Sequence, residues 1–346
     1  MKVTFLAALA VGFALLFGGS AMGAVYTQTN SQRGNAVWRL ERGSDGSLTP
    51  VALYRTGGLG TGAGLGSQGA VALSDDGRIL AAVDAGSNDI AVFRVGRRHG
   101  HLTPIGREPS GGVMPVSVDV DGRSVYVLNA GGATPNVTVF GVDGDGLEVR
   151  DGAALPAGSS GAAQVSVAPD RRSLVVTERG ANRLDTFGLL RGARLGEPVV
   201  TPSSGPVPFG FAFSPRGDLI VSEAANSTVS SYRAGQLVTA SLPVGQGAAC
   251  WVAVTPDGRF AYTGNATGSI SGFAIAPDGS LSALTADGRT ALAPRPNDLA
   301  IAGGFLYAIN PATGEITAYR IGSDGSLTSV PGAADLGNGL AGLAAQ

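Results

Sequence analysis

The sequence predicts an all-β fold, a seven-bladed β-propeller made of four-stranded blades. Short runs rich in β-branched and aromatic residues, such as residues 124–128 and 260–263, alternate with tight turns. Glycine-bearing turns recur about every 40–50 residues, which is the blade period of propellers. Glycine is abundant, at 55 of 346 residues, and no helical periodicity is present. A four-stranded unit cannot bury both faces alone, so such units stack around an axis.

Two series of turns mark the strands within each unit. The first series joins the first and second strands, at residues 75–77, 120–122, 169–171, 215–217, 256–258 and 303–304. The second series joins the third and fourth strands, at residues 45–46, 99–100, 145–146, 191–192, 234–235, 278–279 and 324–325. Glycine supplies the positive φ that such hairpins need. Seven members in the second series predict seven blades, and an eight-bladed ring with one degenerate blade is the alternative.

The two ends of the chain predict how the ring closes. The N-terminal unit lacks a first-series turn because it begins at its second strand, residues 25–27. An orphan strand is expected at residues 340–345. We therefore expect the C-terminal strand to complete the N-terminal blade, which removes two open sheet edges.

The first residues predict an exported protein. Lys2 precedes an uncharged apolar run at residues 3–17, and small residues follow up to Gly23. This is the pattern of a signal peptide, and the apolar run is shorter than a membrane-spanning helix. We expect a signal peptide at residues 1–23 and one propeller domain at residues 24–346. The mature chain is expected in the periplasm or outside the cell, with no membrane association after cleavage of the leader.

Composition excludes several classes of function. Lys2 is the only lysine, so the mature chain has no lysine for a Schiff base, and Cys250 is the only cysteine, so no internal disulfide can form. The net charge is −2 and no basic face is evident, which argues against nucleic-acid partners. No metal-ligand spacing and no nucleotide-binding fingerprint is present. We expect a monomer that needs no metal or cofactor and has a small molecule as its partner.

The topology predicts a site at one mouth of the central channel, where first strands begin and second strands end. The second strands end on acids or amides: Asn30, Asp84, Asn129, Glu178, Glu223, Asn265 and Asn310. Turn chemistry accounts for most of this ring. Glu178 and Glu223 fit that explanation less well, and they are the candidate acid and base. The alternative is that each carboxylate pairs with an arginine, such as Arg179.

The starts of the first strands supply the candidate substrate-binding residues. The set, with two residues from second-strand ends, is Arg179, Gln164, Phe209, Cys250, Trp251, Asn265 and Asn297. Phe209 and Trp251 could stack on a ring-shaped ligand, or they could pack between blades. Cys250 has no histidine to activate it, so a buried thiol is its alternative role. His99 and His101, the only histidines, fall on the opposite face.

The residues resemble those of the seven-bladed lactonase family, which includes bacterial 6-phosphogluconolactonases and fungal 3-carboxymuconate cyclases. The resemblance covers the mature chain and is carried by residues 167–170, 178–187, 208–215 and 248–259. It implies catalytic positions that this chain fills differently. Ala163, beside Gln164, stands where the family has a histidine, Phe209 and Asn265 stand at two arginine positions, and Glu223 is retained. Groups that would hold a phosphate are therefore missing at those positions.

Two functions remain open at this point. The first is an exported lactonase-like enzyme that acts on a lactone or related cyclic small molecule by carboxylate acid/base chemistry. The second is a non-catalytic binding module for a small molecule, a glycan or a protein, because propellers host many unrelated functions.

Overall fold

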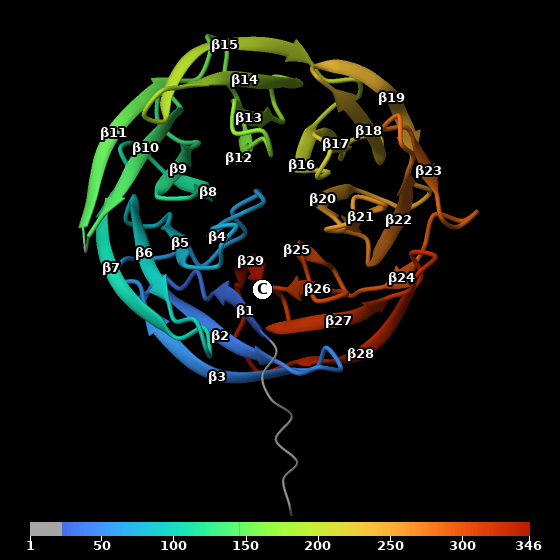
Figure 1. Ribbon diagram of the computed structural model, residues 1–346, viewed down its shortest axis with the longest axis horizontal. Helices are drawn as coiled ribbons and strands as arrows, with labels where there is room; N and C mark the ends of the chain where they lie inside the picture. Colours follow the sequence, from blue (N-terminus) through green and yellow to red (C-terminus); the bar gives the residue numbers. More distant parts are fainter. Residues whose placement is uncertain (1–22, 145) are drawn as a thin grey trace, which may run out of the picture.

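The computed structural model describes residues 23–144 and 146–346, and all regular secondary structure in them is β-strand. The strands form seven antiparallel sheets arranged around a central axis (Figure 1). The predicted all-β, seven-bladed propeller is therefore confirmed. The predicted leader at residues 1–23 lies outside the described residues, except for Gly23. No helix long and apolar enough to span a membrane occurs in the described part of the chain.

Each blade has four strands, called A to D from the axis outward. Blade 1 contains β29 (Ala341–Ala345), β1 (Gly23–Gln28), β2 (Ala36–Arg42) and β3 (Leu48–Arg55). Blade 2 contains β4 (Val71–Leu73), β5 (Ile79–Asp84), β6 (Asp89–Val95) and β7 (Leu102–Pro109). Blade 3 contains β8 (Pro115–Asp121), β9 (Ser124–Asn129), β10 (Asn136–Asp143) and β11 (Gly146–Ala154).

The remaining blades follow the same order. Blade 4 contains β12 (Ala162–Val167), β13 (Ser173–Glu178), β14 (Arg183–Leu190) and β15 (Arg194–Pro202). Blade 5 contains β16 (Pro208–Phe213), β17 (Asp218–Glu223), β18 (Thr228–Arg233) and β19 (Gln236–Pro243). Blade 6 contains β20 (Ala249–Val254), β21 (Phe260–Asn265), β22 (Ser269–Ile275) and β23 (Leu281–Ala283), with β24 (Ala291–Leu292) also paired to β22. Blade 7 contains β25 (Asn297–Ala302), β26 (Phe305–Asn310), β27 (Glu315–Ile321) and β28 (Leu327–Ala333).

The C-terminal strand closes the ring as the sequence predicts. Strand β29 pairs antiparallel with β1, and Val25, Tyr26 and Thr27 lie opposite Ala345, Ala344 and Leu343. Leu343 is buried in the core between blades 1 and 7. The first blade is thus assembled from both ends of the chain.

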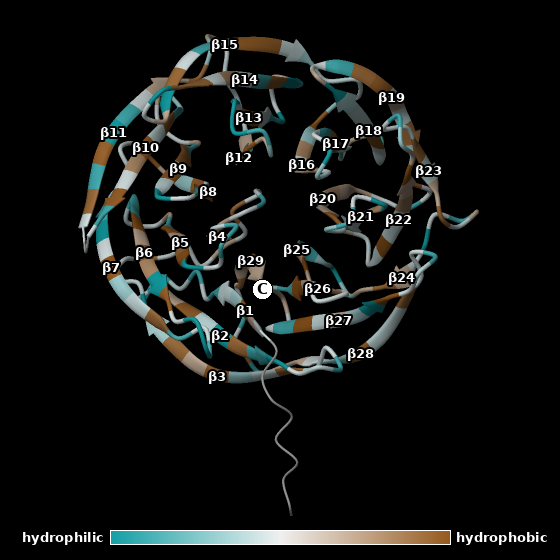
Figure 2. Ribbon diagram, viewed as in Figure 1, coloured by the Kyte–Doolittle hydropathy of each residue, from teal (hydrophilic) through white to brown (hydrophobic). Residues whose placement is uncertain are grey.

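The burial pattern explains why these segments form strands at these depths. Strands β5, β17, β21 and β26 are buried along their whole length. Their apolar side chains face both neighbouring blades, as in sheets covered on both faces. The outer strands β11 and β15 mix exposed and partly buried residues. Figure 2 shows both hydrophilic and hydrophobic residues along these two strands.

Tyrosines on the B strands of blades 1 and 6 fasten these two blades to the next blade of the ring. The hydroxyl of Tyr26 donates to Gly100 O at 2.6 Å, and that of Tyr262 donates to Gly325 O at 2.8 Å. Both acceptors belong to glycine turns between strands C and D of the following blade. A Cβ on Gly325 would lie 2.8 Å from the ring of Phe260, so the turn needs glycine for space as well as for its φ of 83°.

The opposite face carries the D–A linkers and the B–C turns, and we call it the linker face. Residues just before strand A adopt left-handed backbone angles there, including Val207 at φ 60°. Val207 N–H donates to the side chain of Asn182 in the B–C turn of the preceding blade, at 2.7 Å. A left-handed β-branched residue is strained, and such strain persists where surrounding contacts hold it. These contacts fix the start of strand A, where a site at the axis would lie.

Candidate functional site

The linker-face end of the central channel is filled by residues 65–70, which we call the plug. This segment precedes β4, and Figure 1 shows it reaching into the centre of the ring. The Gln68 side chain bonds across the axis to both N–H and C=O of Val252 in blade 6, at 2.9 and 2.7 Å. Gln68 N–H donates to Ala163 O in blade 4, and the Ser67 hydroxyl donates to Val116 O in blade 3. The plug therefore ties together blades that do not adjoin in the ring.

An aspartate holds the far end of the plug. Asp298 in β25 is buried and accepts a hydrogen bond from Gly69 N–H at 3.0 Å and from Leu299 N–H at 2.9 Å. Burial raises the pKa of Asp298 to about 7, although these backbone N–H groups favour the carboxylate. Beyond the plug, the channel keeps a cavity of about 250 Å³ lined by inward residues of the A strands, including Asp119.

Sequence reasoning missed the plug, although the chain carries a signal for it. The linker between β3 and β4 spans residues 56–70 and contains seven glycines, whereas the linker between β7 and β8 spans only residues 110–114. A long linker without secondary structure in a compact domain is commonly functional. Its length and glycine content therefore indicate that this linker has a function besides connecting blades 1 and 2.

Four of the expected substrate-binding residues come together beside the plug. The guanidinium carbon of Arg179 lies 5.2 Å from the centre of the Phe209 ring. The Phe209 and Trp251 rings meet edge to face, with centres 5.5 Å apart. The Trp251 indole N–H donates to Ser67 O at 3.0 Å, and Cys250 belongs to the same buried core as Phe209 and Trp251. The cluster thus combines one cation, two aromatic rings and one thiol at the linker-face mouth.

Arg179 is the member of this cluster that is open to a ligand. It is half-buried, whereas Phe209, Cys250 and Trp251 expose 6%, 7% and 7% of their surfaces. The two rings therefore pack against neighbours and support Arg179 rather than offering open faces for stacking on a ligand. A Cβ on Gly66 would lie 3.0 Å from Arg179 Nη1, so glycine in the plug leaves room beside the guanidinium.

The charge of Arg179 has no acidic partner among the residues that the structure describes. Its Nε donates to Gly161 O at 3.1 Å, and no carboxylate lies within ion-pair distance of its guanidinium. Burial lowers its pKa, but arginine remains charged at neutral pH. A half-buried guanidinium without a counter-ion is suited to bind a carboxylate or a carbonyl oxygen that gains negative charge.

Glu178, a candidate acid or base, is held in a buried ion pair. It exposes none of its surface and pairs with Arg183 Nη2 at 2.8 Å. Its other carboxylate oxygen accepts hydrogen bonds from the Ser159 hydroxyl and Ser160 N–H, both at 2.7 Å. These contacts fasten the D–A linker that precedes β12. Glu178 therefore follows the alternative in which the carboxylate pairs with an arginine, although the partner is Arg183 rather than Arg179.

A second carboxyl group lies beside Glu178. Asp185 on β14 is fully buried, and its Oδ1 lies 3.2 Å from Arg183 Nε. Burial, together with the Glu178 carboxylate, raises the pKa of Asp185 to about 8. Burial also opposes ionisation of Glu178, but the adjacent Asp185 carboxyl and hydrogen bonds from Ser159 and Arg183 lower the pKa of Glu178. Both carboxyl groups lie against Arg183 in a closed part of the blade, and the two Asp185 oxygens are buried without a hydrogen-bond partner among the described residues.

Glu223, the other candidate, is enclosed in the same way without an arginine. It exposes none of its surface and accepts hydrogen bonds from Gly205 N–H at 2.7 Å, the Ser230 hydroxyl at 2.6 Å and the Thr228 hydroxyl at 2.5 Å. Gly205 belongs to the D–A linker before β16. Both glutamates therefore hold D–A linkers in place by hydrogen bonds, and this geometry does not support an acid/base role for them at the mouth.

The three amides of the expected site have separate surroundings. Gln164 bonds to both N–H and C=O of Phe211, at 2.7 and 2.9 Å, and so joins blade 4 to blade 5. Asn265 is fully buried and donates to the hydroxyls of Ser269 and Ser271 within blade 6. Asn297 is half-buried at the start of β25. Gln164 and Asn265 therefore have structural partners and lie outside the cluster of Arg179.

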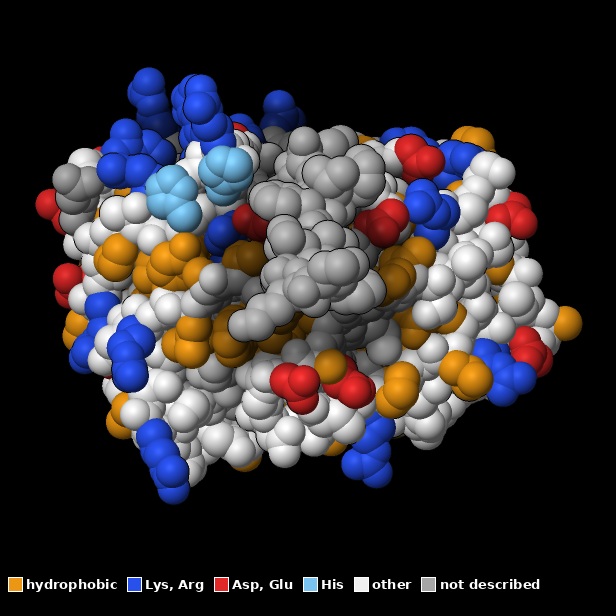
Figure 3. Space-filling view, turned by 90° about the horizontal axis from the view of Figure 1, so that it is seen from below, with side chains coloured by type: hydrophobic (Ala, Val, Ile, Leu, Met, Phe, Trp, Pro, Cys, Tyr) orange, Lys and Arg blue, Asp and Glu red, His pale blue; other side chains and the backbone are white. Residues whose placement is uncertain are grey.

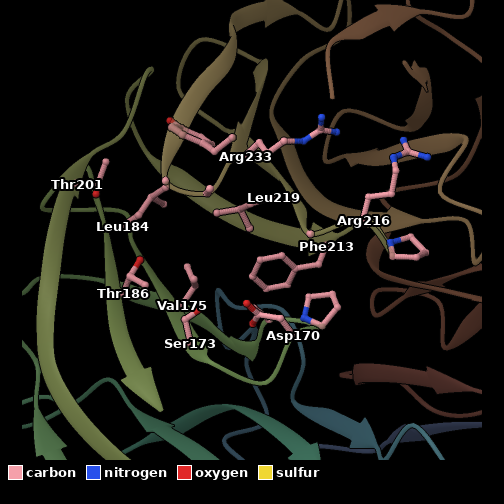
Figure 4. Close-up of a pocket in the computed structure, with 17 residues that line it drawn as sticks. Asp170, Ser173, Val175, Leu184, Thr186, Thr201, Phe213, Arg216, Leu219 and Arg233 are labelled. Atoms are coloured by element: carbon pink, nitrogen blue, oxygen red, sulfur yellow. The ribbon is translucent and has the colours of Figure 1, made fainter. Parts of the chain in front are cut away.

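A larger cleft lies between blades 4 and 5 on the opposite face. It has a volume of about 420 Å³ and is lined by apolar side chains such as Leu184, Phe213 and Leu219 (Figure 4). The two arginines at its rim, Arg216 and Arg233, both pair with the buried Asp218. Both arginines are thus tied to one carboxylate, whereas Arg179 at the mouth has no such partner among the described residues. No group of three or more His, Cys, Asp or Glu side chains placed to hold a metal occurs in the described ranges.

The structure is a closed β-propeller with a half-buried arginine, Arg179, at the linker-face mouth. The chain belongs to the seven-bladed β-propeller lactonase family, whose model matches residues 34–153, 148–238 and 238–341. A 6-phosphogluconolactonase of Enterobacter sp. strain 638 is 26% identical over 302 residues, which cover 82% of this chain and 87% of that protein. A 6-phosphogluconolactonase of Photorhabdus laumondii is 28% identical over 232 residues, which cover 63% and 70%. The resemblance inferred from the sequence motifs is thereby confirmed.

Solved structures show the same fold at lower sequence identity. A putative 6-phosphogluconolactonase from Bacteroides uniformis has a TM-score of 0.75 and 18% identity, and the alignment covers 94% of this chain and 99% of that chain. The Pseudomonas aeruginosa periplasmic gluconolactonase PpgL has a TM-score of 0.72 and 20% identity, with 92% and 98% coverage.

Proposed function

We propose that this chain is an exported lactonase that opens a lactone ring at the linker-face mouth, with Arg179 binding the carbonyl oxygen. The observation that carries the proposal is the half-buried Arg179 guanidinium, which stacks on Phe209 and has no carboxylate partner among the described residues. Membership of the lactonase family supports the reaction class. The leader pattern at residues 1–23 supports export.

The proposed reaction is the hydrolysis of a lactone by water. A water molecule adds to the carbonyl carbon, and the negative charge that develops on the carbonyl oxygen is stabilised by Arg179. The ring C–O bond then breaks, and the ring oxygen takes up the proton that the water gives up. The product is a hydroxy acid, whose carboxylate lies opposite the same guanidinium.

Water is the nucleophile in this scheme because the thiol is inactive. Burial raises the pKa of Cys250 to about 11, although Arg179 acts in the opposite direction. The thiolate, which is the reactive form, is therefore scarce at neutral pH. Glu178 and Glu223 act as positioning residues, because they fix the linkers that lead into the A strands beside the mouth.

Replacing Arg179 tests this proposal. We expect Arg179→Gln to lower kcat/KM about a hundredfold for each lactone that the wild type opens, as removal of one oxyanion donor does in other enzymes. Arg191→Gln, an exposed arginine in the C–D turn of blade 4, removes the same charge far from the mouth and should leave the rate unchanged. The assay follows hydroxy-acid release from a panel of uncharged, carboxylated and phosphorylated lactones against buffer alone. Equal rates for wild type and Arg179→Gln would contradict the proposal.

A second candidate function is binding without turnover. It is favoured by one observation, the full enclosure of both Glu178 and Glu223, which leaves neither of these glutamates free to act as a base at the mouth. In that case the lactone or hydroxy acid would bind saturably, and Arg179→Gln would weaken the binding. The lactone would disappear no faster with the protein than in buffer alone.

A further inference from the structure

A basic surface lies on the opposite face, at the A–B and C–D turns of blades 2 and 3. Two adjoining cavities there have volumes of about 420 and 580 Å³ and share Arg78, Arg97 and Asp76. We call this surface the blade 2 patch. Among the described residues, Asp76 is the only acidic side chain that lines the two cavities, and the arginines that line them are Arg78, Arg94, Arg97, Arg98 and Arg123. A chain with a net charge of −2 thus concentrates positive charge in one place.

Two arginines at the centre of the patch have no ion-pair partner among the residues that the structure describes. Arg97 and Arg98 lie in the C–D turn of blade 2, and both are exposed. In contrast, Arg78 pairs with Asp76 at 3.5 Å, and Arg123 donates to Val142 O at 2.7 Å. Figure 3 shows arginine side chains projecting at the upper left, beside the pale blue histidines of the same turn. This turn therefore presents uncompensated charge to an outside partner.

The patch also adjoins the point where the leader joins the domain. Gly23 lines the same cavity as Arg97 and Arg98. The sequence that precedes Gly23 contains the uncharged apolar run at residues 3–17. Only residues 18–22 separate that run from Gly23, so the folded domain would lie beside any bilayer in which the uncleaved run is inserted. The blade 2 patch is then held close to the lipid headgroups.

We propose that the blade 2 patch docks onto a membrane surface that carries anionic phospholipid headgroups. Clusters of arginine beside a membrane-inserted segment attract anionic headgroups, and the attraction decays within a Debye length. Docking would bring the blade 2 edge of the turn face onto the membrane, with the turns of blade 4 farther from it and the linker-face mouth toward the solvent. This proposal revises the expectation that the chain has no membrane association after the leader is removed.

Vesicle co-sedimentation of the full chain tests the docking. One set of vesicles contains phosphatidylglycerol and phosphatidylcholine in equal amounts, and the other contains phosphatidylcholine alone. We expect the wild type to prefer the anionic vesicles, and the double variant Arg97→Ser, Arg98→Ser to lose roughly tenfold to thirtyfold of that preference. The leader is present in all proteins, so its contribution cancels in the comparison.

The matched control is the double variant Arg191→Ser, Arg194→Ser. These exposed arginines occupy the equivalent C–D turn of blade 4 and change the net charge by the same amount. The control should retain the wild-type preference for anionic vesicles. Raised salt should abolish this preference in the wild type and in the control. The proposal is overturned if the two double variants behave alike, if the wild type does not distinguish the two vesicle types, or if the patch captures a soluble polyanion but no vesicle. Thermal unfolding of each variant confirms that the ring is intact.

Discussion

A chain that ends at Leu340 will fail to form the closed ring. Strand β29 supplies the innermost strand of blade 1, and its Leu343 packs into the core between blades 1 and 7. Leu343 N–H also contributes to holding Asp298, which anchors the plug. Removal of β29 leaves the edge of β1 without a partner and exposes that core. The loss is several kcal/mol or more, comparable to the whole stability of a typical domain, about 5–15 kcal/mol.

The measurement for this prediction is thermal unfolding followed by circular dichroism, together with gel filtration. The truncated chain should show no cooperative transition and should elute as an expanded or aggregated species. A chain that lacks only Gln346 is the matched control, because β29 remains complete. A truncated chain with the midpoint of the control would show that the C-terminal strand does not close the ring.

Replacing Glu223 by leucine will destabilise the fold by about 3–5 kcal/mol. The substitution removes the acceptor of three hydrogen bonds and leaves Gly205 N–H and two hydroxyls buried without it. Each buried donor left without a partner costs about 1–3 kcal/mol. Glu223→Gln keeps one acceptor oxygen, and the hydroxyls can turn to accept from the amide, so it should cost about 1–2 kcal/mol.

Urea unfolding measures both free energies. The pair of variants also separates a fastening role from an acid/base role. If Glu223 only holds the D–A linker in place, Glu223→Gln should hydrolyse lactones at a rate that depends only on the fraction of the protein that is folded. A fully folded Glu223→Gln protein that has lost turnover would show that the carboxylate takes part in the reaction.

The repeat made the architecture predictable from sequence. Turn glycines such as Gly46 and Gly325 contact aromatic residues of the neighbouring blade, so each turn is fixed by space as well as by backbone angle. Because a glycine recurs at the C–D turn of every blade, the blade number and the position of strand β29 followed from the spacing of the turns. The register also placed Arg179, Phe209, Cys250 and Trp251 at one mouth, where the structure brings them together.

The environment of each candidate residue could not be predicted in the same way. The register shows that Glu178 and Glu223 end their strands, but it does not show which linker folds over them. Arg183, five residues after Glu178, pairs with it across adjacent strands, and this pairing depends on side-chain directions. The plug depends on contacts between blade 2 and blades 4, 6 and 7 across the axis, which have no counterpart in the repeat.

The most direct test of the proposed function is a crystal structure of the protein soaked with the hydroxy-acid product of the lactone that it opens best. The account predicts that the product carboxylate lies within hydrogen-bond distance of the Arg179 guanidinium, beside Gly66 and at the edge of the Phe209 ring. The same soak of Arg179→Gln crystals should leave this position empty. Product bound instead in the cleft between blades 4 and 5, or at the mouth without contact to Arg179, would contradict the account.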